Sequence, residues 1–150
     1  MKRLPYGLSD FPRLISEDYY YVDKTRYIEL LENQPDFLFL LRPRRFGKSL
    51  FMAMLETYYS VDYRERFDEL FSGLYIGQHP TPLRNKYLTL RFNFSEVTSN
   101  PDEVERSFKA YCCMVIKDFI IGHEALLGSD VWKVVKADDT DPSAMLSALT

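Results

Sequence analysis

An apolar run followed at once by a basic loop and an amphipathic segment limits most strongly how this chain can fold. Residues 37–41 read Phe-Leu-Phe-Leu-Leu, which is apolar on both faces, as a buried parallel strand is. The loop at 42–49 reads Arg-Pro-Arg-Arg-Phe-Gly-Lys-Ser. Behind it, four apolar side chains recur at helical spacing, namely Leu50, Met54, Leu55 and Tyr58. Residues 37–60 therefore predict a strand, a phosphate-binding loop and a helix.

The loop supplies the residue types that phosphate binding requires. Main-chain N–H groups must converge on the anion, and the helix behind them adds the positive end of its dipole. A lysine must reach the outer phosphates and a hydroxyl must ligate magnesium, and Lys48 and Ser49 stand at those places. With Ser49 as the Mg²⁺ ligand, the residues predicted to bind a nucleoside triphosphate are Arg45, Phe46, Gly47, Lys48, Ser49 and Leu50.

One position departs from the pattern Gly-x-x-x-x-Gly-Lys-Ser/Thr. The leading glycine falls at residue 42, which is an arginine, and arginine does not adopt a positive φ cheaply. Pro43 keeps the residue before it extended. We therefore expect Pro43 to shape the turn by a route that needs no glycine at 42.

Around this unit the sequence predicts an irregular arm at residues 1–22, because Pro5, Gly7 and Pro12 interrupt it. Alternating apolar residues at 87–94 predict a second strand. Further helices are predicted at about 24–33 after a cap at Asp23, at about 63–71 with Gly73 as a left-handed cap, at about 101–121, and from Pro142.

These elements predict an α/β fold. We expect residues 1–150 to form the N-terminal portion of one P-loop NTPase-like domain, a partial three-layer arrangement in which helices flank parallel strands. Its two strands would not be neighbours in a full sheet, so the arrangement would be truncated and would leave sheet edges exposed.

Composition narrows the classes of partner. A net charge of −3 gives no general reason to expect nucleic acid or an anionic membrane, so anion binding must be local. No apolar stretch approaches the roughly 18 residues of a membrane span, and no signal peptide is recognisable. The two cysteines are adjacent and have no metal-binding spacing, which predicts reduced thiols in a cytoplasmic protein.

Residues 39–50, Phe-Leu-Leu-Arg-Pro-Arg-Arg-Phe-Gly-Lys-Ser-Leu, resemble the signature of the predicted AAA-ATPase-like family of bacterial proteins. In that family an Arg-Pro-Arg-Arg-Phe-Gly-Lys-Ser loop replaces the glycine-led form. Similar segments occur along the chain at Leu4–Gly7, Asp10–Phe11, Tyr21–Thr25, Leu70–Ile76 and Tyr87–Ser95. The resemblance implies an ATPase that binds ATP and Mg²⁺.

The resemblance also implies parts that lie beyond residue 150: an acidic strand needed for hydrolysis and, in many members, a PD-(D/E)XK nuclease-like domain that would bring nucleic acid as a partner. Inside the chain, the candidate acidic group is Asp138-Asp139, for which an exposed acidic loop is the competing interpretation. We therefore assign no catalytic residue and do not expect this chain to hydrolyse ATP by itself. The oligomeric state is unknown.

A second hypothesis belongs to another class of protein. Arg42, Arg44, Arg45 and Lys48 would grip a nucleic-acid backbone, and there would be no nucleotide site. Such a contact weakens steeply with salt, which separates the two hypotheses.

Overall fold

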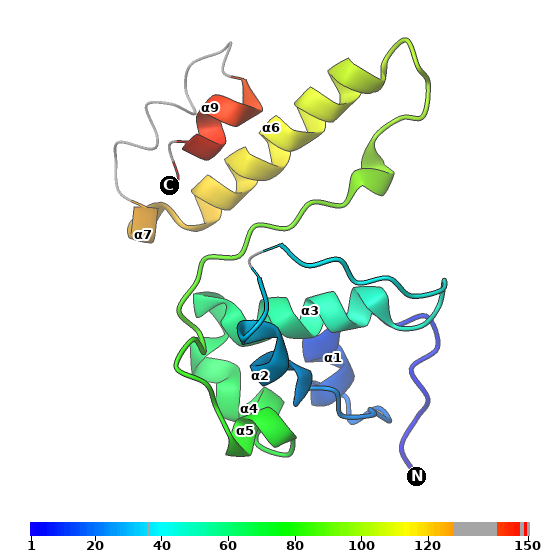
Figure 1. Ribbon diagram of the computed structural model, residues 1–150, viewed down its shortest axis with the longest axis vertical. Coiled ribbons are helices and arrows are strands. Elements are labelled where there is room, and N and C mark those ends of the chain that lie inside the picture. Colours follow the sequence, from blue (N-terminus) through cyan, green and yellow to red (C-terminus); the bar gives the residue numbers. More distant parts are fainter. Residues whose placement is uncertain (36, 128–140, 148, 150) are drawn as a thin grey trace. The chain divides into compact units, whose positions relative to one another are not determined.

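The structure is a computed structural model that describes residues 1–35, 37–127, 141–147 and 149. It consists of two compact units, Met1–Thr89 and Leu90–Thr150. The first unit contains α1 (Phe11–Ser16), α2 (Tyr27–Glu32), α3 (Lys48–Tyr59), the 3₁₀ helix η1 (Val61–Arg66), α4 (Phe67–Phe71) and α5 (Tyr75–Gln78) (Figure 1). The second contains the 3₁₀ helix η2 (Phe94–Glu96), α6 (Val104–Gly122), α7 (Glu124–Leu127) and α9 (Pro142–Ser147).

The predicted α/β fold with flanked parallel strands is wrong, because the described residues form helices and no sheet. Residues 37–41 pair with no other segment of the described chain, and Phe37, Phe39 and Leu41 are 90%, 90% and 89% exposed. A helix satisfies its own main-chain groups, whereas a strand needs a neighbour to pair with. The apolar run at 37–41 therefore carries the composition of a strand without the partner that would make it one.

The second predicted strand, at 87–94, is also absent. Tyr87 forms one isolated parallel bridge with Ser60, and the 3₁₀ helix η2 begins at Phe94. A second isolated bridge joins Arg3 to Tyr19. The alternation of apolar residues at 87–94 is therefore not accompanied by a ladder in the described residues.

Aromatic rings fill the core of the first unit. Tyr58 of α3 lies with its ring centroid 6.0 Å from that of Phe67 and 5.7 Å from that of Phe71. Phe11 of α1 lies 5.2 Å from Phe71. Edge and tilted ring pairs of this kind add to the stabilisation that burial provides. The buried members of this core are Phe11, Ile28, Ala53, Met54, Tyr58, Phe67, Leu70, Phe71 and Ile76.

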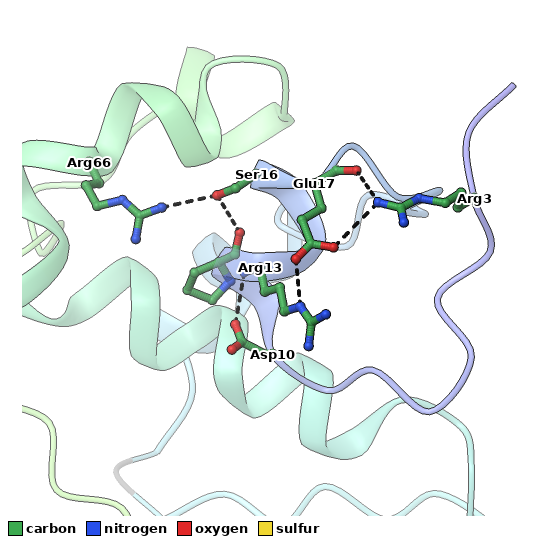
Figure 2. Close-up of polar contacts among 7 residues, drawn as sticks. Arg3, Asp10, Arg13, Ser16, Glu17 and Arg66 are labelled. Carbon is green, nitrogen blue, oxygen red and sulfur yellow. Dashed lines mark hydrogen bonds and ion pairs between the residues drawn. The ribbon is translucent and has the colours of Figure 1, made fainter.

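Helix α1 lies within the segment predicted as an irregular arm. The Asp10 side chain accepts a hydrogen bond of 3.0 Å from the Arg13 N–H, and proline occupies the first turn (Figure 2). An aspartate cap followed by proline is a recognised helix start. This signal was present in the sequence, but the three helix-breaking residues obscured it.

A polar contact joins α1 to α4. Ser16 donates to a Glu69 carboxylate oxygen at 2.9 Å, and the Arg66 guanidinium donates to the same carboxylate at 2.8 Å. The guanidinium also donates to Ser16 at 3.1 Å (Figure 2). The hydrogen bond from Arg66 and then that from Ser16 lower the pKa of Glu69 to about 2.

The short helix predicted at 24–33 is α2, but Asp23 has a different role from the one expected. One Asp23 oxygen accepts from the Thr25 N–H at 2.8 Å and the Thr25 hydroxyl at 2.7 Å. The other accepts from the Tyr75 N–H at 2.8 Å, at the start of α5. Asp23 therefore ties the turn before α2 to a helix more than fifty residues away, instead of capping α2.

The helix predicted at 63–71 is divided into η1 and α4. Its cap is Ser72 with φ −56°, and Gly73 does not have a positive φ, so the left-handed cap predicted at Gly73 is wrong. The following segment, for which no helix was predicted, contains α5.

In the second unit, α6 corresponds to the long helix predicted at 101–121 and packs against α9 (Figure 1). Ile116, Ile120 and Met145 form its buried core. Cys112 and Cys113 form no disulfide, and burial raises the pKa of Cys112. Residues 131–135 and the acidic pair 138–139 lie outside the described residues. No helix in the described parts of the chain is long and apolar enough to cross a membrane.

Candidate functional site

The loop before α3 turns sharply at residues 44–47. Gly47 has φ +74° and Arg45 has φ +67°, whereas Phe46 between them is not in the positive-φ region. Alternating signs of φ turn successive N–H groups toward one side of the chain, as in main-chain anion nests. The sequence predicted that Pro43 shapes the turn without a glycine at residue 42. In the structure the residues with positive φ are Arg45 and Gly47, and an arginine gives no sequence signal for that conformation.

Lys48, the first residue of α3, folds back across this loop. Its ammonium nitrogen donates to the main-chain oxygen of Arg42 at 2.7 Å and to that of Pro43 at 2.9 Å. The chain between 42 and 48 is therefore curled rather than extended. The ammonium group occupies the inside of the curl.

The start of α3 leaves donors free. Gly47 is its N-cap and no side chain caps the helix. In any α-helix the first four N–H groups have no acceptor inside the helix, and here these belong to Gly47, Lys48, Ser49 and Leu50. The Ser49 side chain is exposed beside them.

A cavity of about 570 Å³ lies against this helix start. Five of the six predicted binding residues line it; Phe46 does not, and its side chain is 61% exposed. The opposite wall is a segment that we call the N-terminal strap, residues 5–9. Among the described residues that line the cavity, Arg45 and Lys48 are cationic and none carries a carboxylate.

The N-terminal strap is the part of the site that sequence reasoning missed, because it was read as an irregular arm. Its N-terminal end is tied through Arg3, whose main-chain oxygen accepts from the Tyr20 N–H at 2.8 Å and whose guanidinium lies 4.5 Å from the Tyr19 ring. Arg3 also reaches Glu17 at 3.5 Å (Figure 2). Its other end runs into the Asp10 cap of α1. The strap is thus held at both ends.

Two smaller cavities also reach Gly47. One, of about 190 Å³, is lined by Lys24, Tyr27, Leu30, Leu31, Gln34, Leu40, Arg42, Gly47 and Phe51. The other, of about 230 Å³, is lined by Pro5, Leu14, Tyr20, Tyr21, Val22, Lys24, Gly47, Leu50 and Phe51. Burial raises the pKa of Tyr21 to about 12, so its hydroxyl stays protonated at neutral pH.

The chemistry of this site suits an anion rich in oxygen. Free N–H groups, a helix dipole and two cations converge on one hollow without a competing carboxylate. Among the described residues, no group of three or more His, Cys, Asp or Glu side chains is placed to hold a metal ion.

Comparison with known proteins adds a family. The model of the family described as predicted AAA-ATPase matches residues 5–150. A curated protein from Azotobacter chroococcum mcd 1, named as an uncharacterized protein in the vnfD 5' region, is 42% identical over 76 residues. That stretch covers 50% of this chain and 14% of the relative. No solved structure matches the chain.

Proposed function

The chain belongs to the predicted AAA-ATPase family, and on this premise we propose that it binds a nucleoside triphosphate, ATP with Mg²⁺, in the cavity between the N-terminal strap and the start of α3. Membership of the family suggests the use of a nucleotide and a metal ion. The choice of this cavity is our own inference from its donors and its charge.

The observation that carries the proposal is the position of Lys48. Its ammonium group has three N–H donors and no acceptor, and it donates to the carbonyl oxygens of Arg42 and Pro43. Phosphate oxygens offer a stronger, charge-assisted partner at the same place. The N–H groups of Gly47, Lys48 and Ser49 donate to the same phosphates, and Arg45 adds positive charge.

Ser49 would hold the magnesium ion through its hydroxyl oxygen. When bound, magnesium would neutralise part of the charge of the outer phosphates. The role of this chain is to bind and orient the triphosphate. We assign no proton transfer to any of its residues.

Calorimetric titration of the chain with ATP and magnesium tests the proposal. Lys48→Ala should weaken binding about tenfold or more, because it removes a charge-assisted contact. Lys86→Ala removes an exposed lysine elsewhere in the first unit and is the matched control. Equal affinity of wild type and Lys48→Ala would overturn the proposal, provided that both show the same thermal unfolding.

Magnesium gives a second arm of the same experiment. Ser49→Ala should reduce the affinity measured with magnesium and leave the affinity measured in EDTA unchanged. If Ser49→Ala loses affinity equally in both, the hydroxyl contacts phosphate instead of the metal ion.

The nucleic-acid hypothesis is a distinct outcome. Arg42, Arg44 and Arg45 are exposed, whereas Lys48 turns back into the loop instead of outward. Filter binding to DNA that falls steeply with salt, with no heat from ATP, would favour that hypothesis. The acidic strand and the nuclease-like domain, and with them hydrolysis and a nucleic-acid partner, stay predictions that reading the gene past codon 150 tests.

A further inference from the structure

We propose that the base of the nucleotide binds in the cavity of about 230 Å³ between residues 20–24 and the first turns of α3, which we call the base cavity. This inference rests on the proposed function, since the base is covalently joined to phosphates that lie next door. It gives a binding place to the base, the part of the nucleotide that the loop at 42–49 does not contact.

We call the cavity of about 570 Å³ at the start of α3 the phosphate cavity. Its continuity with the base cavity favours this place over the other apolar cavity. The base cavity and the phosphate cavity share three lining residues, Pro5, Gly47 and Leu50. The cavity of about 190 Å³ shares one residue with the phosphate cavity, Gly47. The base cavity therefore adjoins the site proposed for the phosphates more extensively than the other apolar cavity does.

The lining suits a flat aromatic ring. Tyr20, Val22 and Phe51 present apolar or aromatic surface, as do Leu14, Tyr21 and Leu50. Aromatic side chains stack on bases of any sequence, because every base has a π-face. A volume of about 230 Å³ is below the roughly 300 Å³ at which whole drug-sized ligands begin to fit, so this cavity suits one ring system and not a complete nucleotide.

The wall made by residues 20–22 is held at both ends. The Tyr20 N–H donates to the Arg3 oxygen at 2.8 Å, and Asp23 accepts from the Tyr75 N–H at 2.8 Å. The Tyr20 and Val22 side chains remain 54% and 58% exposed, so a ligand can reach them from solvent. A wall fixed before binding lowers the ordering cost that a ligand must overcome.

Two variants and two ligands test the base cavity. Val22→Gln and Tyr20→Ala each change its lining, and Leu30→Gln changes the other apolar cavity at a matched exposure of 55%. The ligands are ATP and inorganic tripolyphosphate, which carries the charge without the base. Val22→Gln and Tyr20→Ala should each weaken ATP about tenfold and leave tripolyphosphate affinity unchanged. Leu30→Gln should change neither.

The outcomes separate this proposal from the one it rests on. Wild-type affinity for ATP in both base-cavity variants overturns the base cavity alone, as does a loss of ATP binding in Leu30→Gln instead. If Lys48→Ala leaves both ligands bound as in wild type, or if wild type binds neither, the triphosphate site fails and the base cavity fails with it. Val22 is exposed on a non-helical segment, so we expect Val22→Gln to fold. The experiment can therefore be done with this variant if Tyr20→Ala does not fold.

Discussion

The two ends of α3 meet opposite surroundings. Toward its C-terminal end, Ala53, Met54, Thr57 and Tyr58 are all buried, and the Tyr58 ring lies against the rings of Phe67 and Phe71 in α4. At its start, Ser49 is exposed, Lys48 is half-buried, and the loop before them is exposed. A helix transmits the rigidity of its anchored end to its free end. Because the packed aromatic core fixes α3, the start of the helix can leave its N–H groups open to a ligand.

The helices of the core and the segment at 37–41 that leads into the loop differ in the same way. The core elements satisfy their hydrogen bonds inside helices, and their apolar side chains pack together. The run at 37–41, which leads into the loop, has neither a pairing partner among the described residues nor a covered apolar face. Phe and Leu side chains are buried in the core and exposed at 37–41, because burial depends on which surface lies opposite a side chain.

The largest effect should come from the anchored end. Tyr58→Ala removes a fully buried ring and the hydroxyl that accepts from the Thr81 N–H at 2.8 Å. We expect the free energy of unfolding to fall by about 3–5 kcal/mol, as for other buried aromatic truncations. Urea denaturation followed by circular dichroism measures it. Tyr27→Ala, at a position 44% exposed, is the control and should cost far less. Equal losses would mean that α3 has no anchored end.

A smaller effect is expected at the free end. Gly47 has φ +74° and open space where a Cβ would stand, so Gly47→Ala adds strain without a clash. The expected loss is about 1–2 kcal/mol, the cost of the left-handed region for a residue with a Cβ. Gly73→Ala also meets open space, but its φ is not positive, so its unfolding curve should match wild type to within about 0.5 kcal/mol. If both alanines behave alike, the turn at Gly47 is not left-handed in solution.

The smallest effect is a change in pH dependence. The hydrogen bond from Arg66 and then that from Ser16 lower the pKa of Glu69 from 4.5 to about 2. A lowered carboxylate pKa stabilises the folded state above the ordinary pKa, and that stabilisation disappears as pH falls from 4.5 toward 2. Glu69→Gln should therefore unfold at a lower temperature than wild type at pH 6, and the difference should shrink to nothing near pH 2. Midpoints that stay equally far apart down to pH 2 would contradict this assignment.

Short-range signals in the sequence determined much of the helical structure and of the loop. Helix α3, the start of α1 at Asp10 and Pro12, and the places of Lys48 and Ser49 follow from residues within a turn or two of one another. This is because an α-helix closes its hydrogen bonds four residues apart, and a helix start is defined by its own first turn. The positions of residues 45–50 between the apolar run and the helix were likewise enough to nominate them as candidate binding residues.

Only the tertiary structure decided what depends on residues far apart in the chain. It left 37–41 and 87–94 without the ladders that their composition favoured, linked Asp23 to Tyr75, and brought residues 5–9 to the wall opposite Lys48. Strand pairing and cavities are made by surfaces that meet across the fold, so no local pattern specifies them. The sequence by itself thus nominated Lys48 and Ser49 as candidate binding residues, and the fold decided what lies across the cavity from them.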